Sequence, residues 1–423
     1  MKKYYLWVAL FMGLTFIACN DDSNSNDPTP EPGSTIVDDA KYKDRTYGNN
    51  AIDACTHVVS VLENANQMIA KANLSTEQES YLRDVLSNLV GNVIIPTYTD
   101  LANDVEDLEQ TLNGLTVNTI TQAQINNACN DFKKARQHWE RSEAFLMGAA
   151  SDFDVDPTID SWPLNRTLLL SYFNNGMNDE MLEDATILGF HALEFILFRN
   201  GSPRKVDEFK ANDTYKNFEN ISGENELKYA QTICTLLKQR CFQLQVAWEG
   251  ETVANASRVA VVKAAGLEYT TENGLNYGEN LTGAGTNPQS TFATLQAAIA
   301  QVLSDDEGSC VAIANEVGTA KIANPFSAGD ISYVESPYSY NSIVDFQDNI
   351  RSIRNVWNGS TTGAAADKSF RNFFARVNTS VGVQEAVEHA ITQIGNMPSP
   401  FVKYCSTIWN IEFIDDEDWN VEE

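Results

Sequence analysis

A histidine and a glutamate three residues apart are the side chains best suited to chemistry in this 423-residue chain. His191 and Glu194 lie within Ile187–Phe198, which is otherwise apolar on every side and is typical of a helix buried in a core. On a helix the two side chains share a face, with Cβ atoms about 5–6 Å apart. A buried carboxylate must be paired, protonated or bound to a cation, and imidazole with carboxylate forms a ligand pair for zinc or iron. The pair predicts either a metal site or a structural His–Glu hydrogen bond, and the sequence leaves both open.

The other histidines give weaker signals. His389 and its acidic neighbours Glu385 and Glu388 lie opposite an apolar stripe, which indicates a solvated helix face rather than a ligand set. His138 lies in a segment with aromatic and acidic residues that would complete a site. His57 has no partner nearby in the sequence, so we interpret it as incidental.

Motifs of the common enzyme classes are absent from the sequence. There is no His-Glu-x-x-His, and the inverted form His-x-x-Glu-His fails because Phe195 follows Glu194. No Gly-x-Ser-x-Gly elbow, phosphate-binding loop or dinucleotide fingerprint is found either. A conventional zinc protease is therefore disfavoured.

The elements that must position these residues are predicted to be helices. Beyond about residue 50, apolar residues recur at intervals of three and four, and no alternating strand pattern competes with them. Ser75 is typical of a capped helix start. The predicted helices span residues 54–73, 75–89, 97–112, 121–149, 179–198, 224–251, 291–303, 343–357, 368–377, 381–395 and 400–411. This pattern predicts an all-α protein built from helical bundles.

A passage rich in glycine follows the long helix that ends near residue 251. We therefore expect two helical-bundle lobes packed together, residues 50–250 and 251–423, the second with an acidic, solvated tail. Arg136-x-x-Trp139 in the first lobe and Arg354-x-x-Trp357 in the second each follow an Asp-Phe pair. The spacing differs, but the pattern suggests that the lobes are related by duplication.

The N-terminus carries the signals of an exported lipoprotein. Two lysines precede the apolar run Tyr4–Ala18, which is shorter than the ~20 residues of a membrane-spanning helix, so residues 1–18 are predicted to be a signal peptide. The run ends in Phe16-Ile17-Ala18-Cys19, which resembles a bacterial lipobox with Phe16 in place of the usual leucine. Residues 19–49 begin with a stretch rich in proline and acid and are predicted to be a flexible tether.

We accordingly expect a cell-envelope lipoprotein anchored through Cys19, on the periplasmic or surface face of the outer membrane. The alternative is an ordinary secretory signal in which the cysteine is incidental.

Composition limits the partners. The chain has 58 acidic and 29 basic residues and a formal net charge of −29, which argues against nucleic acid and favours cationic partners. The cysteines after Cys19 form no Cys-x-x-Cys motif, and Cys234 and Cys241 are too far apart on one helix to bridge. We expect these cysteines to be buried small hydrophobic residues, with at most one disulfide bridge.

Several segments in combination resemble the imelysin family, also called imelysin-like or insulin-cleaving metallopeptidase family proteins. Gly189-Phe190-His191-Ala192-Leu193-Glu194 is similar to the Gly-x-His-x-x-Glu signature of that family. Trp139 with Ser142–Phe145, then Asp160–Asn165, and finally Glu335–Trp357 are similar to its other segments, and the resemblance spans residue 50 to the end. Asn165 stands where such proteins often have aspartate.

The resemblance implies a two-domain helical protein, commonly secreted or lipid-anchored in bacteria and linked to iron acquisition. It implies a metal site at the interface of the lobes. The metal ligands that it implies are His191 and Glu194. We expect Glu143 to be a third ligand, because a helix that bears aromatic residues and an acid precedes the signature. The residues expected to line the site are Gly189, Trp162, Ser339, Asn341 and Arg351. Ser339 and Asn341 are equally well placed to cap the helix that begins near Ile343.

We therefore expect an imelysin-like protein that binds a divalent or trivalent metal ion, with iron favoured over zinc, and that has iron-uptake membrane components as partners. One alternative is a zinc metallopeptidase, which would need a third protein ligand and an open coordination position. The other alternative is a structural or haem-binding surface lipoprotein. If the protein is structural, the His191–Glu194 pair would only fix the packing of helices.

Overall fold

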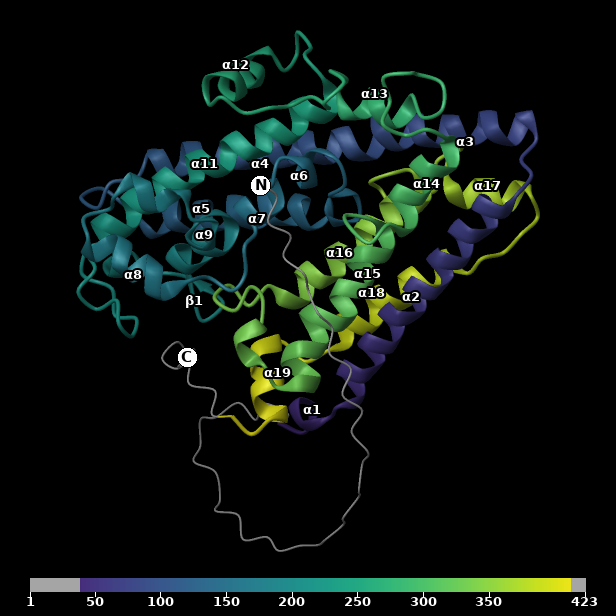
Figure 1. Ribbon diagram of the computed structural model, residues 1–423. Coiled ribbons are helices and arrows are strands. Elements are labelled where there is room, and N and C mark those ends of the chain that lie inside the picture. Colours follow the sequence, from purple (N-terminus) through teal and green to yellow (C-terminus); the bar gives the residue numbers. More distant parts are fainter. Residues whose placement is uncertain (1–38, 412–423) are drawn as a thin grey trace, which may run out of the picture. The chain divides into compact units, whose positions relative to one another are not determined.

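The computed structural model describes residues 39–411, in which nearly every regular element is a helix (Figure 1). Up to the candidate motif the elements are α1 Asp39–Lys43, α2 Thr46–Lys71, α3 Thr76–Leu89, η1 Val90–Ile94, α4 Ile95–Asn113, α5 Gln122–Glu140, η2 Glu143–Phe145, α6 Ala149–Asp152, α7 Val155–Ile159, α8 Arg166–Asn174, η3 Asp179–Glu183, η4 Ala185–Ile187 and α9 Gly189–Leu197. A two-stranded antiparallel pair follows, β1 Phe198–Arg199 and β2 Ser202–Pro203.

The remaining elements are again helices. They are α10 Val206–Phe209, α11 Gly223–Glu249, α12 Ala256–Ala264, α13 Tyr277–Thr282, α14 Leu295–Ser304, α15 Cys310–Glu316, η5 Val317–Ile322, η6 Asn324–Ala328, η7 Ile331–Tyr333, α16 Ser342–Asn358, α17 Phe370–Arg376, α18 Val383–Asn396 and α19 Phe401–Ile408. The all-α fold class is confirmed.

Local sequence explains where the long helices begin and which face they bury. Ser75 caps α3, since its side chain accepts from Gln78 N and the Gln78 side chain accepts from the Ser75 backbone. Along α2, the buried residues recur at helical spacing, as in Cys55, Val58 and Leu62. Burial of such stripes, rather than intrinsic helix propensity, supplies most of the stability of helices of this kind.

The described residues from Ala40 onward belong to one unit. Within it, α4 packs against α5 and α11, and α9 packs against both α5 and α11 (Figure 1). Helix α16 contacts α5, α15 and α18, and α18 lies along α2. Helices from the first part of the chain therefore pack directly on helices from the last part. The lobe boundary near residue 250 stays a prediction.

The helical region begins earlier than the predicted boundary at residue 50. Helix α1 covers Asp39–Lys43 and α2 begins at Thr46, so the last residues of the predicted tether are helical. The cause is packing: Tyr42 and Gly48 are already buried. The predicted signal peptide, Cys19, the rest of the tether and the acidic C-terminal residues lie outside the described residues.

Two further sequence expectations concern the cysteines and the membrane. The described cysteines are all buried and free, as expected for small hydrophobic residues: Cys55, Cys129, Cys234, Cys241, Cys310 and Cys405. Among the residues that the structure describes, no helix has both the length and the apolar character required to cross a membrane.

Candidate functional site

Helix α9 holds His191 and Glu194 deep in the protein. Both residues are 1% exposed, and every residue of Gly189–Leu197 is buried. Gly189 has φ +73°, and a Cβ at this position would lie 2.0 Å from the carbonyl oxygen of Ile159. Only glycine lets α9 start this close to the backbone of α7. The glycine therefore sets the place of the histidine two residues later.

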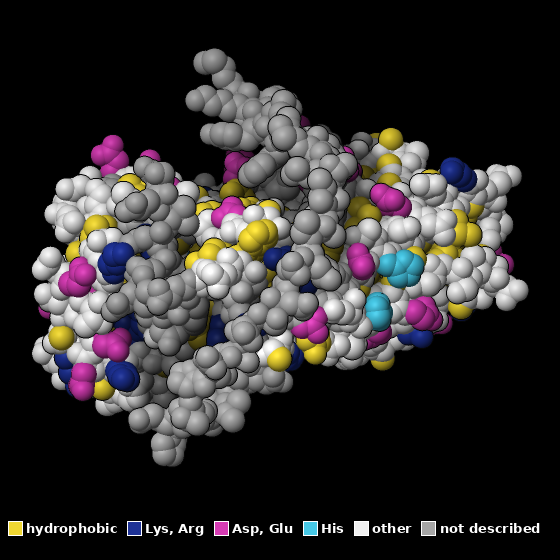
Figure 2. Space-filling model, turned by 90° about the horizontal axis from the view of Figure 1, so that it is seen from below, with side chains coloured by type: hydrophobic (Ala, Val, Ile, Leu, Met, Phe, Trp, Pro, Cys, Tyr) yellow, Lys and Arg dark blue, Asp and Glu magenta, His cyan; other side chains and the backbone are white. Residues whose placement is uncertain are grey.

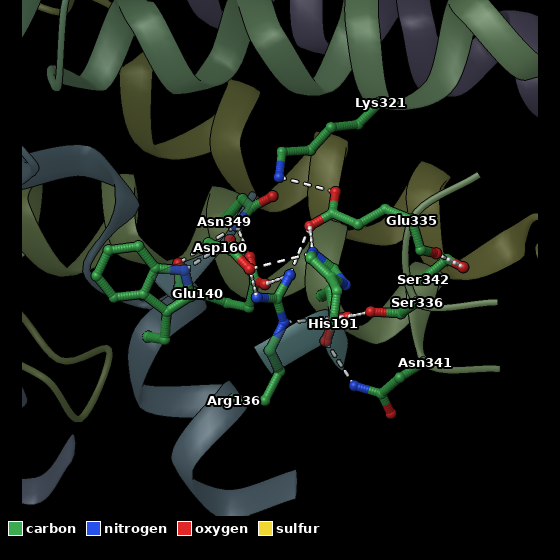
Figure 3. Close-up of polar contacts among 12 residues, drawn as sticks. Arg136, Glu140, Asp160, His191, Lys321, Glu335, Ser336, Asn341, Ser342 and Asn349 are labelled. Carbon is green, nitrogen blue, oxygen red and sulfur yellow. Dashed lines mark hydrogen bonds and ion pairs between the residues drawn. The ribbon is translucent and has the colours of Figure 1, made fainter. Parts of the chain in front are cut away.

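Both ring nitrogens of His191 lie near carboxylates. Its Nε2 lies 3.1 Å from Asp160 Oδ1 and 3.7 Å from Glu335 Oε1 (Figure 3). Its Nδ1 lies 3.7 Å from Glu194 Oε2. The Trp162 ring lies against the imidazole, with the ring centroids 4.6 Å apart. Asp160, His191 and Glu335 each offer a ligand atom, and these atoms lie within 4.8 Å of one another.

Arg136 is buried among the same carboxylates. Its guanidinium forms ion pairs with Asp160, Glu140 and Glu335. One turn further along α5, Trp139 donates its indole N–H to Asp160 Oδ2 at 2.7 Å. Asp160 is therefore fixed by an arginine, a tryptophan and a histidine from two different helices.

Lys321 adds a second buried cation from the π-helical segment η5. Its Nζ lies 2.8 Å from Glu335 Oε2, while the other oxygen of Glu335 contacts Arg136 (Figure 3). Glu335 thus joins the arginine to the lysine, and it lies in the loop between η7 and α16. The cluster is assembled from α5, α9, η5 and two loops.

Glu194 is held by Ser339, which the sequence placed among the lining residues. The backbone N–H and the hydroxyl of Ser339 donate to Glu194 Oε1 at 2.7 Å and 2.6 Å. Among the described residues, Glu194 Oε2 and Trp162 Nε1 are buried side-chain atoms without a hydrogen-bond partner. A buried acceptor and a buried donor beside His191 therefore have no hydrogen-bond partner within the described residues.

Asn341 and Arg351, two other expected lining residues, lie away from the imidazole. The side chain of Asn341 donates to Asp345 and makes no helix-capping bond, although Asn341 is the N-cap residue of α16. Arg351 Nη1 donates to Asp348 Oδ1 at 2.8 Å. Among the described residues, neither side chain forms a hydrogen bond or an ion pair with His191.

Glu143 belongs to a second acidic group. It is buried, and its ligand atoms lie within 4.8 Å of those of Asp156 and Asp160, but it is not grouped with His191. Burial and the neighbouring charge of Asp160 raise the pKa of Asp156 to about 7. Asp160 is a member of both groups and joins them into one acidic cluster.

Burial, set against the two fixed cations, governs protonation in this cluster. Burial raises the pKa of Glu140 and of Glu143 well above the usual range. Burial also favours the neutral form of Asp160, but Arg136 and His191 outweigh it and hold its pKa below the usual range. Burial and Arg136 disfavour the charged imidazole, yet the Asp160 carboxylate outweighs both and raises the pKa of His191 to about 9. Some acids in the cluster are ionised and others carry protons.

Sequence reasoning from single helices missed most of the cluster. Arg136, Glu140, Asp160, Lys321 and Glu335 were not among the expected ligands. One signal was available: Arg136 and Glu140 are spaced i and i+4 on a predicted helix, on the side that carries Trp139. Charged residues on a buried helix face point to a polar cluster in the core.

The chain is similar to known proteins over most of its length. The family model for Imelysin matches residues 94–404, which include every residue of the cluster. Iron-regulated protein A of Synechococcus elongatus is 23% identical over 286 residues, covering 68% of this chain and 67% of that protein.

Two solved structures are similar to the chain. A candidate iron-regulated protein A precursor from Parabacteroides distasonis has a TM-score of 0.58 and 21% identity, covering 80% of this chain and 97% of the other; it shows that the fold is shared. An imelysin-like protein from Psychrobacter arcticum has a TM-score of 0.44 and 14% identity, covering 78% of this chain and 95% of the other.

Proposed function

Because the chain belongs to the imelysin family, we propose that it binds a metal ion, with iron favoured over zinc, and takes part in iron acquisition. The observation that carries the proposal is the buried Asp160–His191–Glu335 donor set, whose ligand atoms lie within 4.8 Å of one another. The name of the similar iron-regulated protein A supports iron as the metal.

The chemistry of the donor set fits an ion of this type. One imidazole with carboxylates is a ligand combination of non-haem iron and of zinc. Asp160, His191 and Glu335 would hold the ion, which would supply positive charge to a cluster rich in carboxyl groups. Glu194 suits a supporting role, since it faces the other ring nitrogen of His191 and is itself held by Ser339. A carboxylate behind a ligand histidine fixes its ring orientation and tautomer.

Arg136 and Lys321 stabilise the carboxylates through direct ion pairs. The removal of one partner from a buried ion pair is strongly destabilising, so these cations are needed for the acidic groups to stay buried. We therefore expect the protein to keep its fold when a chelator removes metal. Metal binding should release protons, because the raised pKa of His191 keeps its imidazole charged whereas a ligand imidazole must be neutral, and because Glu140 and Glu143 hold further protons nearby.

The test is metal analysis of the purified full chain after incubation with Fe²⁺, Fe³⁺ or Zn²⁺ and removal of free ions. We expect stoichiometric metal in the wild type and its loss in His191→Ala and Asp160→Asn. His138→Ala is the matched control, because His138 Nδ1 also contacts a carboxylate, Asp104 Oδ2 at 2.7 Å, outside the cluster.

Retention of metal by both site variants would overturn the proposal, and so would a wild type that binds none of the three ions. Preferential loading with Fe²⁺ or Fe³⁺ supports iron handling. Preferential loading with Zn²⁺, together with cleavage of an unfolded polypeptide, would instead favour the metallopeptidase alternative.

We also propose that the chain is a cell-envelope lipoprotein anchored in the outer membrane through Cys19, with iron-uptake membrane components as partners. The support lies in the sequence, where lysines, the apolar run Tyr4–Ala18 and a lipobox-like segment precede an acid- and proline-rich stretch. An anchored protein with a tether of this composition would present its metal site within reach of a membrane transporter.

A further inference from the structure

A cavity of about 400 Å³ lies at the protein surface between α2 and α18, outside the acidic cluster. It is lined by Asn50, Asp53, Ala54, His57, His389 and Gln393. Figure 2 shows histidine side chains lying close together on one face of the protein, beside acidic side chains. All of its lining side chains except Ala54 carry polar atoms, so the cavity offers ligand atoms to a small polar molecule or an ion.

The helical spacing brings ligand-type side chains to this cavity from both sides. Asp53 and His57 are four residues apart on α2 and share one face. His389 and Gln393 have the same spacing on α18. Two imidazoles and a carboxylate therefore line one hollow, although the histidines are far apart in the sequence and neither forms a ligand set on its own helix.

These side chains are free to take a ligand. His57, His389 and Asp53 are exposed, and within residues 39–411 none of the three side chains takes part in a hydrogen bond or an ion pair. Their ligand atoms are more widely spaced than those of the Asp160–His191–Glu335 set. A shared ion would therefore require rotation about the side-chain bonds of these three residues, and their exposure leaves them room to rotate.

We propose that this cavity is a second metal site, for an imidazole-binding divalent ion such as Zn²⁺ or Ni²⁺. His57 and His389 would supply nitrogen ligands, Asp53 a carboxylate ligand, and water the remaining positions. The formal net charge of −29 favours a cation over an anion here. An ion in this site would connect α2 to α18 and so tie the start of the described chain to its end.

The site is independent of the proposed iron site, because it shares no residue with the acidic cluster. The experiment therefore uses the full chain with the substitution His191→Ala, which removes a ligand of the buried set. Calorimetric titration with Zn²⁺ alone, and with Ni²⁺ alone, should show one bound ion per chain in this background.

Adding His57→Ala or His389→Ala should lower the Zn²⁺ affinity at least about tenfold, since each removes one of two imidazole ligands. Adding His138→Ala is the matched control and should leave the affinity unchanged. Zn²⁺ should also raise the melting temperature through binding to the folded state, and this rise should disappear in the His57→Ala, His389→Ala double variant.

Both histidines are exposed, so the double variant should melt at the same temperature as its parent when no metal is added. Unchanged Zn²⁺ affinity in the double variant would overturn the proposal. The same conclusion would follow if Zn²⁺ bound to the parent but left its melting temperature unchanged. If His191→Ala removes the ion of the Asp160–His191–Glu335 set but still binds Zn²⁺ through His57 and His389, the proposal is supported.

Discussion

Asp160 is shared by the two buried acidic groups, the one with His191 and the one with Glu143. It accepts from Trp139, pairs with Arg136, and lies 3.1 Å from the Nε2 of His191. It also belongs to both the group with Glu335 and the group with Glu143. An ion held by either group would use the same carboxylate, so we expect the two groups to act as one site rather than to load independently.

Gly189→Ala is expected to destabilise the protein by about 3 kcal/mol. The added Cβ would meet the carbonyl oxygen of Ile159, and φ +73° is a backbone conformation that alanine adopts only with strain. Because α9 would have to move away from α7, His191 should shift with it and metal binding should weaken. Chemical denaturation followed by circular dichroism measures the change in the free energy of unfolding.

Gly266→Ala separates the effect of the steric clash with Ile159 from the effect of the positive φ. Gly266 has a similar φ of +68°, but a Cβ there meets nothing within 4 Å. The Gly266→Ala variant should therefore lose only about 1 kcal/mol in the free energy of unfolding, from backbone strain alone. Equal losses in the two variants would show that the close approach of α7 does not constrain α9.

A second residue-scale prediction concerns pH and Glu226, which lies on α11 away from the acidic cluster. Burial raises the pKa of Glu226 to about 7 from 4.5, although Arg204 Nη2 lies 3.0 Å from its Oε2. The folded protein therefore binds a proton that the unfolded chain releases, and the free energy of unfolding should fall as pH rises from 4.5 to 7. The fall should be up to about 3 kcal/mol, at about 1.4 kcal/mol per pKa unit.

Glu226→Gln should remove this part of the pH dependence, measured by urea denaturation at several pH values. Glu224→Gln is the matched control, because Glu224 is exposed on the same helix and pairs only with the exposed Lys228. A slope between pH 4.5 and 7 that is the same in Glu226→Gln as in the wild type would contradict the assignment.

At the scale of elements, amphipathic helices could be predicted from the sequence, and elements shaped by tertiary contacts could not. The helices predicted at 97–112, 224–251 and 343–357 match α4, α11 and α16 to within two residues at each end. Each of these buries an apolar face against neighbours, so its period is visible in the sequence.

Two of the helix predictions that failed lie beside the cluster. The helix predicted over 121–149 ends at Glu140, and a short 3-10 turn, η2, then precedes Gly148, whose φ is +72°. The helix predicted over 179–198 is α9 preceded by two 3-10 segments. Helices α8, α12 and α15 were not predicted either. Beside the cluster, the turn at η2 carries the buried Glu143, and such turns depend on tertiary contacts that a local sequence pattern does not reveal.

Physical pattern alone predicted the candidate site only where its residues lie in one recognisable segment, whereas Trp162 and Ser339 were expected as lining residues alongside the family resemblance. His191 and Glu194 stand out because they are polar within an apolar helix. Arg136 and Lys321 do not, because a lone arginine or lysine is usually exposed. Their burial follows from ion pairs to Glu335, which is distant from both in the sequence.

Lys321→Met tests the contribution of the π-helical segment η5 to this cluster. Lys321 is 7% exposed, and its removal would leave Glu335 without one of its buried cations. We expect a loss of up to about 3–5 kcal/mol in the free energy of unfolding, the usual cost of removing one partner from a buried ion pair, with Arg136 still paired to the other oxygen of Glu335. Adding Glu335→Gln should recover part of the loss, because the buried carboxylate that lost its lysine is then neutral.

Lys228→Met provides the comparison, because Lys228 and its partner Glu224 are both exposed. An exposed pair spaced i and i+4 contributes about 0.3–0.5 kcal/mol, so this variant should be nearly neutral. A loss in Lys321→Met as small as that in Lys228→Met would mean that η5 does not stabilise the cluster.

At the scale of the whole molecule, charge and attachment act in opposite directions near a membrane. A formal net charge of −29 repels anionic lipid, an effect that salt screens beyond about 10 Å. Residence at a membrane therefore requires a hydrophobic anchor, and a single fatty chain gives only marginal binding whereas several chains hold a protein firmly. Lipidation at Cys19 would supply this anchor.

Cys19→Ala should therefore release the protein from the membrane. The wild type, expressed in a bacterial host that lipidates exported proteins, should incorporate labelled fatty acid and sediment with membranes. The variant should incorporate none and should lose its resistance to extraction at high salt, since salt removes proteins bound by charge alone. Cys55→Ala is the control, because Cys55 is buried and free in the folded protein, and this variant should keep both the label and the membrane location.

Labelling that persists in Cys19→Ala would place the anchor elsewhere. An unlabelled wild type that is recovered in the soluble fraction would instead support an ordinary secretory signal, in which case the metal site would act in a freely diffusing protein.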